Sequence, residues 1–133
     1  MTVRHLTQEW LDRYLELAAD LPEEEGASAV LEHVVAKTPD GDVTYVVRWE
    51  DGRPVEARLG PADGADPDEV LRLSIAYPEA QAMARGELDL PTGFMQGRVK
   101  LVGSTGRFLA LQGALQSDAH RAALAALAAD TEV

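Results

Sequence analysis

The sequence predicts an α+β fold in which helices cover one face of a five-stranded, largely antiparallel sheet. Three consecutive segments between residues 28 and 59 alternate apolar and polar side chains, as half-buried strands do. Two short turns join these segments, and each contains an Asp-Gly pair. Apolar residues recur at helical spacing on both sides of this region. The central segments are therefore expected to form an antiparallel meander, which the flanking helical segments can cover.

The first helix is predicted to begin after Thr7, because the Thr7 side-chain oxygen can accept a hydrogen bond from a free N–H group of the first turn. Apolar residues recur at helical spacing over residues 10–18. Leu21-Pro22 is expected to end the helix, because proline has no N–H group to donate. Three glutamates at 23–25 then form an acidic linker that we expect to be solvated.

The three strands of the meander are predicted at residues 28–38, 43–50 and 53–59. The first is rich in β-branched valine, which favours strands. Alternation gives the second strand one apolar face, made of Val43, Tyr45, Val47 and Trp49. The two turns contain Asp40-Gly41 and Asp51-Gly52, where glycine readily takes the positive φ that a tight hairpin needs.

A polar loop over residues 60–67 separates the meander from a fourth strand at 68–76. Alternation gives this strand an apolar face made of Leu71, Leu73 and Ile75. A helix is predicted to start at Tyr77-Pro78, because proline is tolerated in the first turn. Gly86 marks its end, because glycine tolerates the left-handed conformation found just past many helix ends.

The remaining segments follow a connector at residues 87–91 and are predicted as a short helix at 92–96, a strand at 99–103 and helices at 105–117 and 119–129. Asp118 is expected to cap the last helix, whose alanines favour helix formation. The apolar stripe of that helix consists of Leu124 and Leu127 and is thin. We therefore expect this helix either to dock loosely or to close one side of a cavity.

The chain has 133 residues, which suffice for one domain over residues 1–133 with a hydrophobic core. It carries 23 acidic and 12 basic residues, and its formal net charge is −11. An acidic surface argues against nucleic acid as a partner, because phosphates need clustered Lys and Arg. No apolar run approaches the roughly 20 residues of a membrane-spanning helix, so we expect no stable membrane insertion.

Cysteine is absent, which excludes disulfides, thiolate catalysis and cysteine-bound metals. The first ten residues lack the continuous apolar core of a signal peptide. Both observations favour a cytoplasmic protein. Arginine far outnumbers lysine and asparagine is absent, a residue usage that we associate with a GC-rich bacterial genome.

The three histidines, His5, His33 and His120, lie in an N-terminal tail, a predicted strand and the last predicted helix. No pair has the spacing of a zinc site, so no metal, cofactor or catalytic residue is assigned. Structural or surface roles are favoured for all three. One alternative stays open, in which His33 and a carboxylate face a common pocket and act as an acid–base pair.

The segment from residue 83 to residue 117 intersperses short apolar runs with glycine. The segment has the order Gly-x-Leu-Asp, then proline, then Phe-Met-x-Gly-x-Val-Lys-Leu-x-Gly, and then a further glycine. This order resembles that of the sterol carrier protein type 2 lipid-binding domain. The matching residues are Gly86, Leu88, Asp89, Pro91, Phe94, Met95, Gly97, Val99, Lys100, Leu101, Gly103 and Gly106. The order of elements on either side also fits, so the resemblance covers most of the chain. The family often has an acidic residue or asparagine after the strand, whereas this chain has Ser104-Thr105, which leaves the ligand open.

The resemblance implies the same fold with an apolar tunnel between the sheet and the helices. The inward strand faces would form its floor, with Val43, Tyr45, Val47, Leu71, Leu73 and Ile75. The helices and connectors would form its walls and roof, with Met83, Leu88, Phe94, Met95, Phe108, Leu111 and Leu115. Methionine and phenylalanine suit adjustable walls, although such a set taken alone is ordinary core in most proteins. The glycines Gly97, Gly103 and Gly106 would allow a helix to move and the tunnel to open.

The densest basic cluster in the sequence is Arg98, Lys100 and Arg107. Solvated cations that balance an acidic surface are the favoured interpretation. The alternative is that these side chains meet a carboxylate or phosphate head group at the mouth of the tunnel.

These expectations favour a small, soluble, intracellular carrier of an apolar ligand (a sterol, a fatty acid or a fatty acyl thioester) without enzymatic activity. Two alternatives stay open. One is an interaction or dimerisation module, which forms a homodimer or partners a lipid- or steroid-modifying enzyme. The other is a small cone-fold cyclase, isomerase or hydratase that uses His33 and a carboxylate. A continuous apolar tunnel favours the carrier, and a packed interior favours the interaction module.

Overall fold

The computed structural model describes residues 2–132 and contains one five-stranded sheet with the strand order β4-β3-β2-β5-β6. The strands are β2 (Ala29–Thr38), β3 (Gly41–Glu50), β4 (Arg53–Leu59), β5 (Val70–Ala76) and β6 (Val99–Val102). Strands β2 and β5 run parallel, and the other neighbouring strands run antiparallel. The predicted α+β fold with a largely antiparallel sheet is confirmed.

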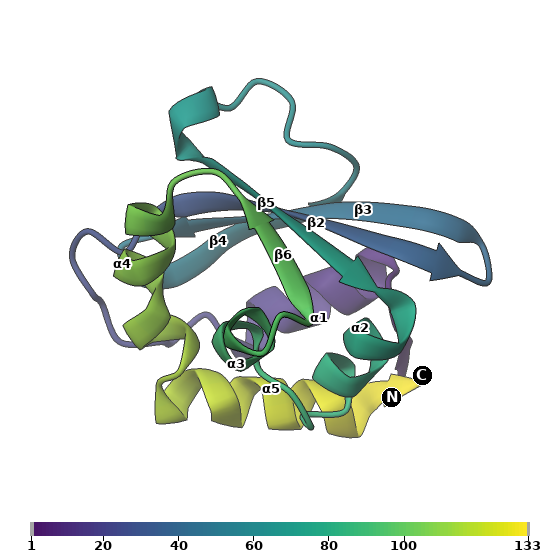
Figure 1. Ribbon diagram of the computed structural model, residues 1–133. Coiled ribbons are helices and arrows are strands. Elements are labelled where there is room, and N and C mark those ends of the chain that lie inside the picture. Colours follow the sequence, from purple (N-terminus) through teal and green to yellow (C-terminus); the bar gives the residue numbers. More distant parts are fainter. Residues whose placement is uncertain (1, 133) are drawn as a thin grey trace.

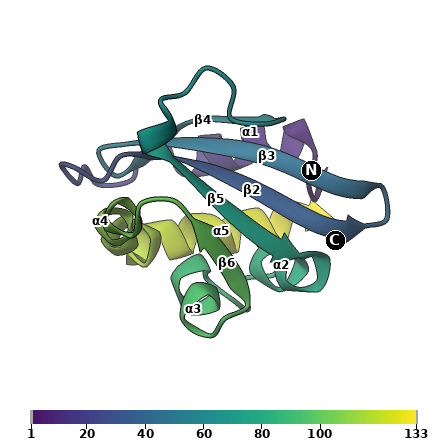
Figure 2. The same cartoon turned by 45° about the horizontal axis from the view of Figure 1, so that its top comes forward.

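The α-helices lie on one side of this sheet (Figures 1 and 2). They are α1 (Gln8–Leu17), α2 (Tyr77–Ala84), α3 (Leu90–Met95), α4 (Thr105–Leu115) and α5 (Asp118–Asp130). The segment that joins β4 to β5 projects from the other side of the sheet and contains a 3-10 turn, η1 (Pro67–Glu69). The helical layer therefore covers a single face of the sheet.

Two further strands, β1 (Val3–Arg4) and β7 (Thr131–Glu132), pair in parallel and bring the two ends of the chain together (Figure 1). The backbone N–H of His5 continues this pairing and donates to the carbonyl oxygen of Glu132 at 3.1 Å. These strands left no signal in the sequence, because two residues carry no periodicity. The pairing of β1 with β7 fixes the position of the next residue, His5.

The turn between β3 and β4 confirms the sequence prediction directly. Asp51 and Gly52 have φ values of 47° and 87°, as a tight hairpin with two left-handed central residues requires. In the turn between β2 and β3, Gly41 has a φ of 91° and already begins β3. The pairing register shifts between Val35 and Thr38, so this hairpin is less regular than the predicted one.

Side-chain caps decide where several elements begin, and two predicted starts were wrong for this reason. Helix α3 begins at Leu90 rather than at residue 92, because Asp89 Oδ1 accepts the N–H of Thr92 at 2.8 Å. Pro91 then lies in the first turn, where no N–H group is needed. Helix α5 begins at Asp118, because Ser117, and not Asp118, accepts the N–H of His120 at 3.1 Å.

Other boundaries differ by a few residues. Strand β5 begins at Val70 rather than at 68, because Asp66 accepts the N–H of Asp68 at 3.0 Å and starts η1. Helix α1 ends at Leu17, before the predicted stop at Leu21-Pro22. Its predicted cap is confirmed, since Thr7 Oγ1 accepts the N–H of Trp10 at 3.3 Å.

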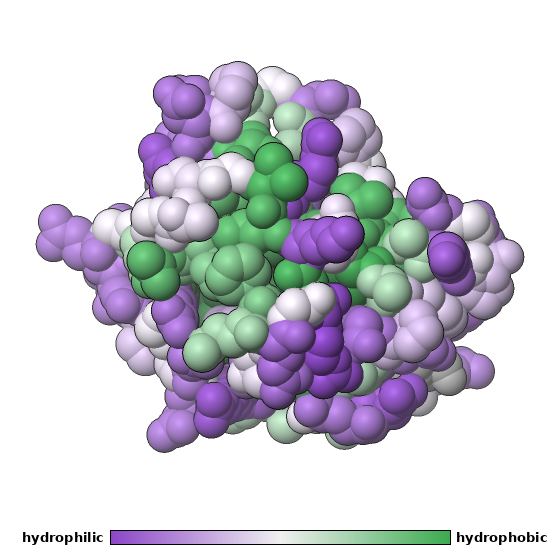
Figure 3. All heavy atoms as spheres, viewed as in Figure 1, coloured by the Kyte–Doolittle hydropathy of each residue, from purple (hydrophilic) through white to green (hydrophobic). Residues whose placement is uncertain are grey.

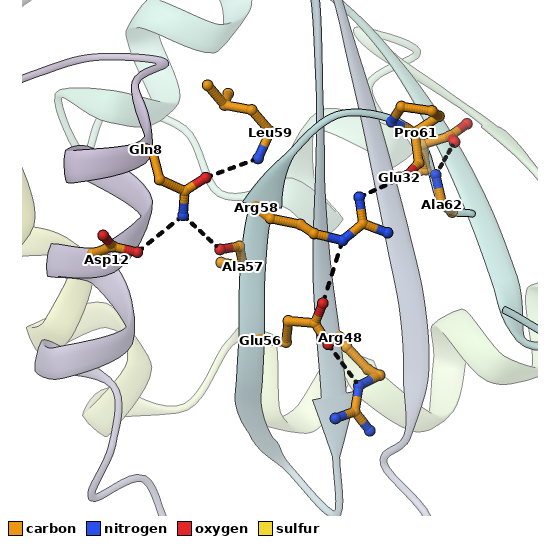
Figure 4. A network of polar contacts seen from close by, with 10 residues as sticks. All are labelled: Gln8, Asp12, Glu32, Arg48, Glu56, Ala57, Arg58, Leu59, Pro61 and Ala62. Carbon is orange, nitrogen blue, oxygen red and sulfur yellow. Dashed lines mark hydrogen bonds and ion pairs between the residues drawn. The ribbon is translucent and has the colours of Figure 1, made fainter. Parts of the chain in front are cut away.

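The outer face of the sheet carries a polar network that holds the 60–66 segment (Figure 4). The buried Glu32 carboxylate accepts the N–H of Ala62 at 2.8 Å and the Nε of Arg72 at 2.6 Å. The hydrogen bond from Ala62 is the main reason that the pKa of Glu32 lies below its ordinary value. Burial of the carboxylate opposes this effect, and Arg72 lowers the pKa further. Arg58 Nη1 also donates to the carbonyl oxygen of Pro61 at 2.9 Å.

Gln8 joins helix α1 to the edge strand β4 (Figure 4). Its Nε2 donates to the carbonyl oxygen of Ala57 at 2.9 Å, and its Oε1 accepts the N–H of Leu59 at 3.0 Å. The side-chain amide therefore takes the place of a further strand at this point of the sheet edge. Helix α1 is thus fixed to the sheet at its N-terminal end.

Candidate functional site

A cavity of about 100 Å³ lies between the inward face of the sheet and helices α1, α2 and α5. Most of its wall is apolar or aromatic. The sheet contributes Leu31, Tyr45, Val47, Trp49 and Ile75, and the helices contribute apolar residues that include Leu11, Ala80, Met83, Ala84, Leu124 and Leu127. Helix α5 closes one side of the cavity, which is one of the two roles expected for it.

Six of the residues predicted to contact a ligand line this cavity, namely Tyr45, Val47, Ile75, Met83, Leu88 and Leu115. They come from the inward faces of β3 and β5, from α2 and the connector after it, and from the last residue of α4. Strand alternation accounts for the first three. The structure thus brings together residues from both the predicted floor and the predicted roof.

The other predicted residues lie outside the cavity wall, and they are Val43, Leu71, Leu73, Phe94, Met95, Phe108 and Leu111. Helix α4 stands at the opposite end of the sheet from α2, so its buried residues Phe108 and Leu111 belong to the core there (Figure 1). Phe94 packs edge-on against Phe108, with ring centroids 5.2 Å apart. The Met95 side chain is 77% exposed and points away from the interior.

All three histidines line the cavity, although they are far apart in the sequence. The sequence did contain a signal for His33, because it shares the inward face of β2 with Leu31 and Val35. For His5 there was none, because its position depends on the pairing of β1 with β7. The sequence prediction treated the three as separate structural or surface histidines, and it did not foresee that they line one cavity.

His120 is paired within the protein. Its Nδ1 lies 2.9 Å from the carbonyl oxygen of Leu115, and its Nε2 lies 2.8 Å from the hydroxyl of Tyr14. A carbonyl oxygen only accepts, so Nδ1 carries the proton and Nε2 accepts the Tyr14 hydroxyl hydrogen. Burial lowers the pKa of His120 and raises the pKa of Tyr14, so both groups are neutral near pH 7.

A second group of rings lies in the cavity wall, and we call it the aromatic cluster: His5, Trp10, His33 and Tyr45. The ring centroids are 4.8 Å apart for His5 and Trp10, 5.6 Å for Trp10 and Tyr45, and 4.3 Å for Tyr45 and His33. Within residues 2–132, no hydrogen-bond partner meets His5 Nδ1, Trp10 Nε1 or His33 Nδ1, and all three atoms are buried. Burial lowers the pKa of His33 to about 3 and that of His5 to about 4.

Charge is scarce around the cavity. Among the described residues, Asp89 is the one acidic side chain in the wall, and no Lys or Arg lies there. Asp89 caps α3 and lies 3.7 Å from Arg121 Nη2. The structure thus places His33 and one carboxylate, that of Asp89, in the wall of one cavity. No hydrogen bond joins the two side chains in the described part of the chain, and Asp89 already accepts the N–H of Thr92.

The predicted basic cluster lies outside the cavity wall. Arg98 forms an ion pair with Glu79 at 2.6 Å, and Arg107 Nη1 donates to the carbonyl oxygen of Ser28 at 3.3 Å. Over residues 2–132, no group of three or more His, Asp or Glu side chains is placed to hold a metal ion. In the same range, no helix has both the length and the apolar character needed to cross a membrane.

Apolar side chains also reach the surface. Figure 3 shows them gathered on the face that carries β6, with α3 and α4 beside it. These elements contain three exposed apolar residues, Met95 in α3, Val102 in β6 and Leu109 in α4, of which the last two are 65% and 64% exposed. We call these three residues the β6 patch.

The fold is found in several solved structures. The conserved hypothetical protein TT1886 of Thermus thermophilus, described as possibly a sterol carrier protein, superposes with a TM-score of 0.71 at 18% identity, over 92% of this chain and 88% of that one. A structure of sterol carrier protein 2 gives a TM-score of 0.67 at 19% identity, over 93% and 96%. Palmitated SCP2L2 from Aedes aegypti gives 0.58 at 16% identity, over 88% and 96%.

None of the curated proteins compared with the sequence matches it. The family comparison, in contrast, gives a match over most of the chain. Residues 11–116 match the model of the SCP-2 sterol transfer family. This range includes the residues that carry the resemblance, from Gly86 to Gly106, and every strand of the five-stranded sheet. The chain therefore belongs to the SCP-2 sterol transfer family.

Proposed function

We propose that this protein is a non-catalytic carrier that binds an apolar small molecule in the cavity between the sheet and the helices. The observation that carries the proposal is the cavity itself, whose wall is mostly apolar and is built by both layers of the fold. Hydrocarbon buried there would contribute roughly 25 cal/mol for each Å² removed from water, before the entropy lost on association. Family membership supports a lipid or sterol as the ligand, and the palmitated relative supports an acyl chain among the candidates.

The cavity would have to grow to hold a sterol or a long acyl chain. A cavity of roughly 150 Å³ admits a single benzene ring, and this one is about 100 Å³. Growth toward α4 would bring Phe108 and Leu111 to the ligand, as the sequence predicts. Met83 in the wall is half-buried and adaptable, so it is the side chain best suited to move first.

The test is a substitution in the cavity wall that fills the cavity with a larger side chain. Ala80 is buried in α2 and lines the wall, so Ala80→Leu would place three extra carbon atoms in the space that a ligand needs. We expect it to reduce uptake of the fluorescent dye N-phenyl-1-naphthylamine by about tenfold or more while the protein stays folded. Ala84→Val is a milder version, should the larger side chain overpack the site.

The matched control is Ala122→Leu, the same change on the exposed face of α5. It should leave dye uptake unchanged. A folded Ala80→Leu protein that takes up the dye as well as the wild type does would overturn the assignment of the site. If the wild type takes up no dye and no lipid, the carrier proposal fails altogether.

A second candidate is the interaction module, and the β6 patch favours it. Strand β6 is at one end of the sheet order, and Val102 on it is exposed, as are Met95 in α3 and Leu109 in α4. An apolar surface at a sheet edge suits a second copy of the chain or a partner enzyme. Sedimentation equilibrium of the wild type and of Val102→Lys tests the form of this candidate in which the partner is a second copy. That form requires a dimer of the wild type that the substitution dissociates.

We also propose that residues 1–133 act as one domain in the cytoplasm of a bacterium. Composition supports this placement, since the chain has no cysteine and an arginine-rich residue usage. The carrier proposal does not depend on it.

A further inference from the structure

We propose that the aromatic cluster is a hydrogen-bonding subsite for an uncharged polar group of the ligand, a hydroxyl or a carbonyl, and that the cavity selects such a ligand over a carboxylate of the same chain length. This inference rests on the proposed carrier function and specifies its ligand. It assigns the hydrocarbon part of the ligand to the apolar wall formed by α2, α5 and the sheet.

The unpartnered polar groups carry the argument. His33 is 6% exposed and Trp10 is 9% exposed, yet His33 Nδ1 and Trp10 Nε1 meet no hydrogen-bond partner within residues 2–132. Buried polar atoms are nearly always hydrogen-bonded, because an unmade bond leaves their desolvation uncompensated. These two atoms and His5 Nδ1 belong to residues that line one cavity, and we assign their missing partner to a ligand or water held there.

The chemistry of these side chains matches a neutral group. The Trp10 indole N–H can only donate, whereas a neutral imidazole offers one donor and one acceptor. A hydroxyl can accept from Trp10 and donate to an imidazole nitrogen at the same time, and a carbonyl can accept from either donor. His120 takes no part, because the Leu115 carbonyl and the Tyr14 hydroxyl already occupy both of its ring nitrogens.

Electrostatics disfavours a carboxylate in the same place. The low pKa values of His33 and His5 keep both rings uncharged near pH 7. In the part of the chain that the structure describes, the wall has no Lys or Arg and one carboxylate, Asp89. A buried anion would therefore have no counter-charge, and it would enter a protein whose net charge is already −11.

The experiment compares three ligands of one chain length, decan-1-ol, decanoate and decane, by calorimetric titration of the wild type at pH 7.5. We expect decan-1-ol to bind at least about tenfold more tightly than decanoate, which would lack a counter-charge. Equal or tighter binding of decanoate would overturn the subsite while leaving the carrier function intact. If none of the three binds, the carrier function itself fails.

The variant His33→Phe separates the polar contact from the apolar one. Phenylalanine keeps the stacking on Tyr45 and removes both ring nitrogens, so decan-1-ol should bind about tenfold more weakly while decane binds unchanged. Val34→Ile, a change on the opposite face of the same strand, is the matched control and should alter neither ligand. An equal loss for decan-1-ol and decane in His33→Phe would show that the residue only shapes the cavity.

Discussion

The imidazole ring of His33 stacks on the phenol ring of Tyr45, with ring centroids 4.3 Å apart and the planes inclined by 8°. The two residues are register partners on the antiparallel strands β2 and β3, and both are buried. The pairing places a titratable ring in the floor of an apolar cavity. Burial there lowers the pKa of His33 from 6.5 to about 3, so the folded protein holds this ring neutral where the unfolded chain would bind a proton.

His33 should therefore make the protein sensitive to acid. Between pH 6.5 and about pH 3 the unfolded chain binds the proton and the folded protein does not, so stability falls as the pH falls through this window. The contribution of His33 is at most about 1.4 kcal/mol for each pH unit. Chemical denaturation at several pH values should show that His33→Phe gains stability relative to wild type as the pH drops from 6.5 to 4. Parallel curves for the two proteins would contradict the burial of a neutral histidine.

The pair Tyr14–His120 should contribute to stability through its hydrogen bond. Tyr14→Phe removes the hydroxyl and leaves His120 Nε2 buried without a donor, so the free energy of unfolding should fall by about 1–3 kcal/mol. Tyr77→Phe serves as the control, because it removes the same hydroxyl from a tyrosine that is only partly buried. Equal stability of Tyr14→Phe and wild type in urea would show that the bond does not persist in solution.

On the outer face, Glu32 should hold the segment that joins β4 to β5. Glu32→Ala removes the acceptor of the Ala62 N–H, and we expect it to lower the free energy of unfolding by about 2 kcal/mol and to speed hydrogen exchange at Ala62. Because the folded pKa of Glu32 lies below its ordinary 4.5, this stabilisation is present above that pH and is lost as the pH falls through the lowered value. Glu56→Ala, which breaks only exposed ion pairs to Arg48 and Arg58, should change stability by less than about 1 kcal/mol.

The glycines at the predicted joints should differ in their tolerance of a side chain. Gly103 has a φ of 131°, and a Cβ atom there would lie 2.8 Å from the carbonyl oxygen of Val70. Gly97 has a φ of 73°, with no atom within 4 Å of its Cβ position. Gly103→Ala should therefore destabilise the protein by about 3 kcal/mol and Gly97→Ala by about 1 kcal/mol, measured by thermal unfolding. A smaller effect at Gly103 would show that the end of β6 moves freely.

Much of the fold could be predicted because its signals are local. The Asp51-Gly52 turn fixes a hairpin within four residues, and Thr7 caps its helix through a bond to Trp10. The starts that were misplaced, at α3 and α5, depend on which polar side chain reaches the backbone of the first turn. Sequence pattern alone does not distinguish Ser117 from Asp118 as the cap, since both residue types are favoured there.

The cavity was predictable in part for the same reason. Alternation along β3 places Tyr45 and Val47 on the inward face whatever the helices do. The position of α4 relative to α2 is a tertiary property, so sequence pattern could not separate Phe108 in the core from Met83 in the cavity wall. The approach of His5 to the aromatic cluster depends on strands at the two ends of the chain, and no local pattern reports it.

The measurement that tests the central claim most directly is methyl NMR of the protein titrated with decan-1-ol. Ile75 is the only isoleucine in the chain and lines the cavity. Met83 also lines the cavity, whereas Met95 lies on the surface and serves as an internal control. Binding in the cavity predicts nuclear Overhauser contacts from the alkyl chain to the Ile75 and Met83 methyl groups, with none to Met95. Contacts at Met95 alone, or no change in any of these methyl groups at saturating decan-1-ol, would contradict the account.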